Sequence, residues 1–178
     1  RGLPYTNARG ASRDATELRK VIETHGWPGE VLVGPEGAEA AWLVLQYASA
    51  ESEFMRDCRT VIEAASQVGQ VPRWQCAYLD DRMRVFEGRL QRFGTRFYMT
   101  PASPEINELE DPGQVDLWRR EVGFGPVGEV LSNARDYQLP TEAELQATQA
   151  RGNVWRRKVG CRAGAARLHD STHETSTR

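Results

Sequence analysis

Apolar residues recur at helical spacing in three stretches between residues 14 and 67, and glycine or proline follows the first and the third stretch. Residues three and four apart lie on one face of an α-helix, so the pattern predicts three amphipathic helices that pack against one another. The residues that form the pattern are Ala15, Leu18, Val21, Ile22, Ala38, Ala41, Trp42, Leu45, Phe54, Cys58, Val61, Ile62 and Ala65.

Local signals set the expected boundaries of these helices. Residues 1–11 lack periodicity and predict a lead-in arm, and Asp14 is a suitable cap for the first helix. Pro35 suits the first position of a second helix over about 35–48. A third helix is expected over about 50–67.

The pattern changes after the third helix. Residues 74–79 predict a short helical turn, and residues 82–98 predict a β-hairpin with a two-residue turn that ends at Gly88. Two short helices are expected over 114–122 and 126–135. The sequence therefore predicts an α+β fold: a mainly helical single domain with a β-hairpin packed on helices two and three.

Charge divides the chain into a body and a tail. Residues 151–178 hold seven Lys and Arg against two acids, which leaves 16 basic and 23 acidic residues in the rest of the chain. We expect a globular domain over 12–137 and a flexible, charged, partly disordered tail over 138–178. An acidic body argues against nucleic acid as a partner, because phosphate binding needs clustered cations. Any contact with nucleic acid would then be made by the basic tail.

Composition suits a cytoplasmic protein. The 178 residues are enough for one domain, and no apolar run approaches the roughly 20 residues of a membrane helix. The three cysteines form no C-x-x-C pair, which favours a reducing compartment. His169 and His173 share a helical spacing in the polar tail but have no third ligand nearby. No phosphate-loop, dinucleotide, serine-elbow or zinc-protease motif occurs, so we expect no metal and no cofactor.

Several polar residues stand where a fold alone would not select them. Gln46 follows Trp42 by four residues on the most apolar helix, and a buried glutamine without partners costs about 1–3 kcal/mol. It either ties a loop to the helix or lines a pocket. On the predicted hairpin, Arg82 and Gln91 share a face with phenylalanines, a setting that suits a carboxylate. The alternative is a structural ion pair between Asp81 and its neighbour Arg82.

An ordered set of short motifs points to a family. The motifs are Gly26-Trp27-Pro28, Ala41-Trp42 with Gln46, Ala77-Tyr78-Leu79-x-Asp81-Arg82, Gln91-x-Phe93-Gly94-Thr95, and Asp111-Pro112 with Arg119-Arg120. Over about residues 14–133 this order resembles the bacterial domain-of-unknown-function 6624 family. The resemblance implies that the recurring polar positions converge on one site, and it brings no established activity. Three positions depart from the family pattern: Tyr47 replaces a usual His, Met55 a usual Gln, and Arg96 a usual Gln.

These residues support one leading hypothesis, an enzyme or enzyme-like pocket that acts on a small polar, anionic substrate by metal-independent acid–base chemistry. Proton transfer is assigned to Asp81 or Tyr47. Substrate binding is assigned to Trp27, Gln46, Arg82, Gln91, Thr95 and Arg96. A role in bacterial specialised metabolism is a further hypothesis. The alternative is a non-catalytic protein-interaction or immunity-type module, and the third is nucleic-acid contact through the basic tail.

Overall fold

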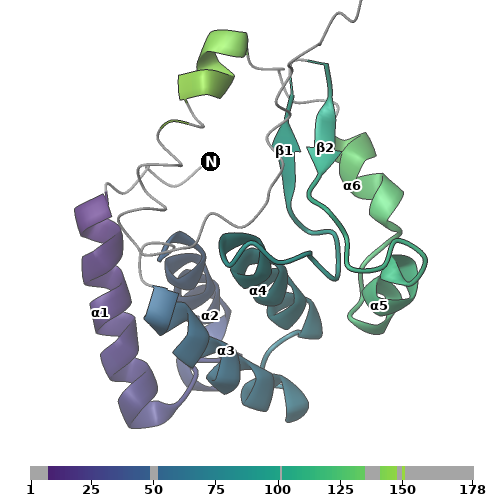
Figure 1. The fold of residues 1–178 in the computed structure, drawn as a ribbon. Helices are drawn as coiled ribbons and strands as arrows, with labels where there is room; N and C mark the ends of the chain where they lie inside the picture. Colours follow the sequence, from purple (N-terminus) through teal and green to yellow (C-terminus); the bar gives the residue numbers. More distant parts are fainter. Residues whose placement is uncertain (1–7, 49–51, 101, 135–140, 148–149, 151–178) are drawn as a thin grey trace, which may run out of the picture.

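A computed structural model of the chain describes residues 8–48, 52–100, 102–134, 141–147 and 150. Four helices come first: α1 (Ala8–His25), α2 (Glu30–Tyr47), α3 (Ser52–Gln67) and α4 (Arg73–Phe86). They are followed by strands β1 (Phe97–Met99) and β2 (Pro104–Ile106) and by helices α5 (Val115–Glu121) and α6 (Val127–Ala134). Figure 1 shows α1–α4 together on one side, with the two strands, α5 and α6 on the other. A mostly helical chain with one two-stranded antiparallel sheet confirms the predicted α+β class.

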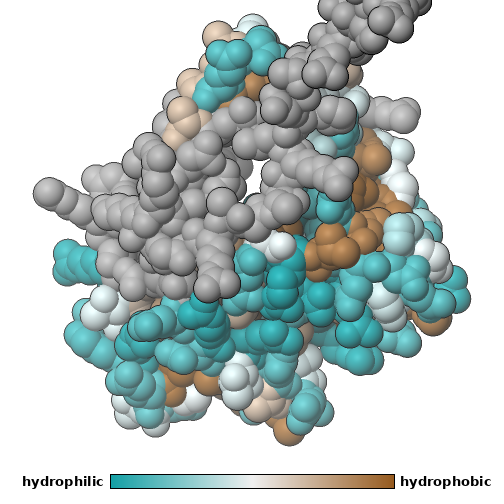
Figure 2. All heavy atoms as spheres, viewed as in Figure 1, coloured by the Kyte–Doolittle hydropathy of each residue, from teal (hydrophilic) through white to brown (hydrophobic). Residues whose placement is uncertain are grey.

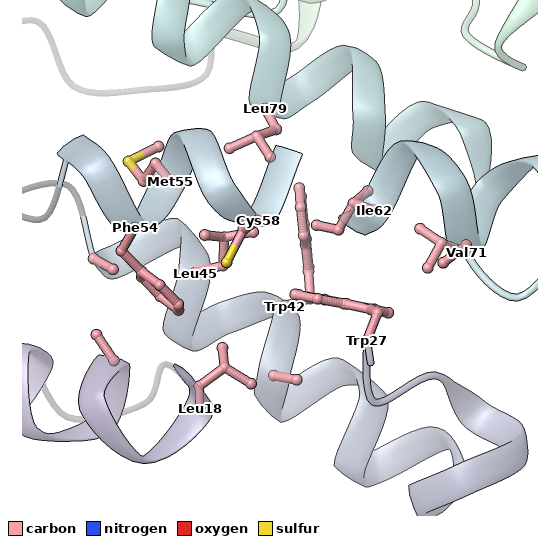
Figure 3. Packing of buried hydrophobic residues seen from close by; sticks show 14 of the residues in the cluster. Leu18, Trp27, Trp42, Leu45, Phe54, Met55, Cys58, Ile62, Val71 and Leu79 are labelled. Carbon is pink, nitrogen blue, oxygen red and sulfur yellow. The ribbon is translucent and has the colours of Figure 1, made fainter. Parts of the chain in front are cut away.

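The main core lies between α1, α2, α3 and α4. Its largest fully buried apolar side chains are Phe54, Leu45, Met55, Ile62 and Leu79. Figure 3 shows these side chains gathered between the helices, with Trp27 beside Trp42 in the middle of the view. The helical periodicity therefore identified most of the core, except that Val21 is 36% exposed and Ala38 is not part of the cluster.

Two helix starts differ from the expected ones. Helix α1 begins at Ala8 instead of near Asp14, because residues 8–11 include alanines and an arginine that favour helix. Helix α2 contains a break at Gly34, whose φ of 74° is a left-handed conformation that suits glycine. Pro35 follows the break, as predicted, and the turn before it leaves Val31 93% exposed.

The predicted hairpin over residues 82–98 is wrong in position. Residues 82–86 continue helix α4, because Leu79, Met83 and Phe86 lie on one helical face and pack on the core. Arg84 supports the same helix through an ion pair with Asp80, four residues earlier, at 2.7 Å. The short helical turn expected over 74–79 is thus part of a longer helix.

The sheet lies further along the chain and packs elsewhere than expected. Phe97 pairs with Ile106 and Met99 with Pro104, and β2 packs mainly against α6 instead of helices two and three. Figure 2 shows hydrophobic residues gathered over the hairpin and α6, with hydrophilic residues covering the helices beside them. Helices α5 and α6 occur where the sequence predicted them.

The titration of Tyr98 can be used to test the pairing of this hairpin. Its hydroxyl donates a 2.7 Å hydrogen bond to its cross-strand partner Glu105, and this bond raises the pKa of Tyr98 to about 12. We expect an ultraviolet titration of the folded chain to show one tyrosine near pH 12, and Glu105→Ala to return that step toward pH 10. Because the folded pKa is raised, the hydrogen bond stabilises the chain below about pH 10 and is lost as the pH rises to about 12.

Tyr98→Phe is the control for this titration, since it should remove the step near pH 12 and leave the others in place. A Glu105→Ala chain with an unchanged titration curve would contradict the assignment.

Candidate functional site

Asp81, at the end of α4 that faces the hairpin, organises the loop over residues 91–96. Its carboxylate accepts hydrogen bonds from the backbone N–H groups of Arg92 at 2.7 Å, Phe93 at 3.0 Å and Thr95 at 2.9 Å. The Thr95 hydroxyl donates a fourth bond at 3.0 Å. Asp81 is completely buried. Its side chain therefore fixes the backbone of the loop.

Gln91 holds the same loop from its other side. Its amide nitrogen donates to the carbonyl oxygens of Arg96 at 2.9 Å and Asn107 at 2.7 Å, and its amide oxygen accepts the Arg96 N–H at 3.0 Å. Gln91 is also completely buried. Both amide N–H groups and the amide oxygen are thus used, two of the bonds on the backbone of Arg96 and one on that of Asn107.

Arg119 joins α5 to this loop. Its guanidinium donates to the Phe93 carbonyl oxygen at 2.6 Å and to the Gly125 carbonyl oxygen at 2.5 Å. It also lies over the ring of Phe124, 5.0 Å from the centroid. Burial lowers the pKa of Arg119, and Asp116 and Asp81 act in the opposite direction. The hydrogen bonds of Arg119 thus go to backbone carbonyl groups.

The side chain of Arg96 differs from those of its neighbours. The residue is half-buried, and burial lowers the pKa of its guanidinium, while Tyr78 and Asp81 act in the opposite direction. Among the described residues, none forms a hydrogen bond or an ion pair with this guanidinium. The backbone of Arg96 is therefore fixed, and its guanidinium is partly desolvated, with no hydrogen-bond or ion-pair partner among the described residues.

A row of aromatic rings leads to Arg96. Trp42 meets Trp74 edge to face at 5.7 Å, Trp74 meets Tyr78 at 6.1 Å, and Tyr78 meets Phe124 at 5.8 Å between ring centroids. Trp74, Tyr78 and Phe124 are each half-buried. The row connects the helical core with the α5–α6 turn and gives the surroundings of Arg96 an apolar side.

Gln46, near the end of α2, lies next to Arg82 of α4. Arg82 follows Tyr78 by one helical turn and donates a hydrogen bond to the Gln46 carbonyl oxygen. The side-chain amide nitrogen of Gln46 is buried, and no hydrogen-bond partner for it occurs within the described part of the chain. We call Gln46, Tyr78, Arg82, Arg96 and Phe124 the Arg96 site.

The structure separates the roles that sequence had grouped together. Burial raises the pKa of Asp81, and the N–H groups of Phe93, Thr95 and Arg92 act against that rise. Four donors use its carboxylate, so Asp81 holds the loop, and its role in proton transfer stays a prediction. Gln91 and Thr95 likewise hold the loop. The side chain of Tyr47 lies outside the described residues, so its proposed role stays a prediction.

Trp27 does not join the other predicted site residues. It is 5% exposed, packs beside Trp42, and lines a separate cavity of about 220 Å³ near the start of α2. The other lining residues of that cavity are His25, Gly29, Val31, Leu32 and Gln70. None of them belongs to the Arg96 site.

Sequence reasoning missed Tyr78 and Phe124 as site residues. Tyr78 stands inside the Ala77–Arg82 motif, so its position in that motif was the available signal. Phe124 follows Gly123 in the turn between α5 and α6. Its contact with Tyr78 spans more than forty residues of sequence, and no local spacing reveals it.

The described residues show neither a metal-binding cluster nor a membrane-spanning helix. No group of three or more His, Cys, Asp or Glu side chains there is arranged to hold a metal ion. None of the described helices combines the length and the apolar character that a bilayer crossing requires.

Comparison with known proteins gives one match. The model of a group described as "Family of unknown function (DUF6624)" matches residues 5–139, a span that includes the whole Arg96 site. No curated protein and no solved structure matches the chain significantly.

Proposed function

We propose, from the premise that the chain belongs to the DUF6624 family of unknown function, that its Arg96 site binds a small organic anion. The observation that supports this proposal is the half-buried guanidinium of Arg96, which has no hydrogen-bond or ion-pair partner among the described residues. Removing a charge from water is unfavourable unless a partner compensates it. A bound anion supplies that compensation.

The geometry favours binding because the position of Arg96 is set before any ligand arrives. Gln91 bonds both the N–H and the carbonyl oxygen of Arg96, and Asp81 fixes the preceding residues. A site that is already ordered loses little conformational freedom when a ligand binds. The planar guanidinium also suits a carboxylate, which it can contact through two parallel hydrogen bonds.

The other groups of the site are mainly hydrogen-bond donors. They are the Tyr78 hydroxyl, the Arg82 guanidinium and the buried amide nitrogen of Gln46. Asp81 supplies no free acceptor because four donors occupy it. A ligand rich in acceptor oxygens therefore matches this surface.

Catalysis on the bound anion is part of the proposal. Metal-independent acid–base chemistry needs a group that exchanges a proton, and the Tyr78 hydroxyl is the described candidate in the site. Tyr47 stays a second candidate. A cytoplasmic location and a role in specialised metabolism stay hypotheses. The predicted nucleic-acid contact falls on residues 151–178, outside the described residues.

Replacing Arg96 tests the proposal. We expect a panel of small carboxylates and phosphates to include an anion that stabilises the chain by about 2.7 kcal/mol at one hundred times its dissociation constant. Arg96→Gln should abolish that shift in melting temperature while leaving the unliganded chain folded. The measurement is a thermal-shift assay of the full chain with each anion.

Arg92→Gln is the matched control, because Arg92 lies in the same loop but places its guanidinium over Trp118, 4.5 Å from the ring centroid. It should keep the anion response. An equal response in the Arg96→Gln chain, or no response to any anion in the parent chain, would overturn the proposal.

A second candidate function is protein interaction, favoured by the exposed apolar turn before Gly34. Val31 is 93% exposed, Leu32 54% and Val33 41%, and two of them line the 220 Å³ cavity. Adjacent exposed apolar residues are typical of interaction surfaces. A folded chain that no anion stabilises would make this surface the leading candidate.

A further inference from the structure

We infer that the Arg96 site takes a monocarboxylate joined to an apolar, planar body, and not a phosphate ester. This inference rests on the proposed function and names the chemical class of its ligand. Three features of the site support it: the use of the loop N–H groups, the charge near Arg96, and the aromatic row.

Most backbone N–H groups of the loop, which could otherwise bind a phosphate, already have acceptors within the protein. Phosphate sites in proteins use successive N–H groups of a loop or a helix N-terminus. Here the N–H groups of Arg92, Phe93 and Thr95 point at the Asp81 carboxylate. The N–H group of Arg96 points at the Gln91 side chain. A built-in carboxylate thus already occupies the position where this loop would hold a phosphate.

The charge near Arg96 suits a single negative charge. Asp81 is the carboxylate whose charge acts on the Arg96 guanidinium. A phosphate ester brings close to two negative charges at neutral pH, and it would meet repulsion from this buried carboxylate. A carboxylate ligand brings one charge and matches the two-pronged guanidinium.

The aromatic row supplies an apolar surface for the rest of the ligand. Trp74, Tyr78 and Phe124 are half-buried, so part of each residue stays accessible to a ligand, and Tyr78 is the member of the row next to Arg96. A ring packed edge to face on another ring gains about 0.5–1.5 kcal/mol beyond the burial of its area. A planar apolar body next to the carboxylate can make such contacts, whereas a bare anion such as acetate cannot.

Four matched probes test the inference by isothermal titration calorimetry of the full chain: phenylacetate, acetate, phenyl phosphate and benzyl alcohol. We expect phenylacetate to bind about tenfold more tightly than each of the others. Arg96→Gln should weaken phenylacetate binding about tenfold. Phe124→Leu should weaken phenylacetate roughly threefold or more and leave acetate unchanged.

The outcomes separate this inference from the proposed function. Tighter binding of phenyl phosphate than of phenylacetate would overturn the inference that the ligand is a carboxylate. The proposal that the site binds an anion would stand. Equal affinity for acetate and phenylacetate would overturn the inference that the ligand carries an apolar body. If none of the three anions binds and the wider anion panel also fails, both the inference and the proposed function fall.

Discussion

Asp81→Asn should lower the free energy of unfolding by about 3–5 kcal/mol and remove anion binding together with it. The asparagine amide group keeps one acceptor oxygen and replaces the other with an N–H₂ donor. That donor would face the Thr95 N–H and hydroxyl, which now donate to the carboxylate at 2.9 and 3.0 Å. Each buried donor left without an acceptor costs about 1–3 kcal/mol. Urea denaturation followed by circular dichroism measures the change.

Asp57→Asn is the matched control for this variant. Asp57 is exposed and pairs with Arg19 at 3.4 Å, and exposed ion pairs contribute about 0–1 kcal/mol. A loss below about 1 kcal/mol in the Asp81→Asn chain would show that the loop does not depend on this carboxylate.

Phe54→Ala should destabilise the chain by about 3–5 kcal/mol through the cavity that it leaves in the core. Phe54 is 2% exposed at the start of α3, and the Arg19 guanidinium lies over its ring at 4.9 Å from the centroid. The substitution removes both the buried ring and this contact. Phe54→Leu keeps most of the volume and should cost about 1.5 kcal/mol or less.

The same denaturation experiment compares the two Phe54 variants. Alanine and leucine variants of equal stability would mean that the core rearranges to fill the space, contrary to the close packing expected around a side chain that is only 2% exposed.

The first helices were predictable because their apolar faces repeat over several turns. In α3, Phe54, Cys58 and Ile62 are all buried, and no strand pattern fits that spacing. Residues 82–86 are different, because five residues with apolar side chains at 83 and 85 also fit a strand. Tertiary packing decided between the two, since Met83 completes the core-facing side of α4.

The site residues were only partly predictable for a related reason. Asp81 and Gln91 were singled out as polar residues in apolar surroundings, and both are completely buried. Their roles depend on backbone groups five to sixteen residues away, which side-chain spacing does not describe. A sequence can thus indicate that a polar residue is buried. It does not show whether the side chain contacts a ligand or holds the backbone of a loop.

The way in which Asp81 and Gln91 hold the 91–96 loop has a consequence for how such a protein can evolve. Their bonds go to backbone groups, which are the same whatever side chains the loop carries. Exchanges at positions 92 and 96 can therefore change the chemistry presented by the loop while its path stays fixed. One scaffold could in this way acquire new ligand preferences by single substitutions, without first losing its shape.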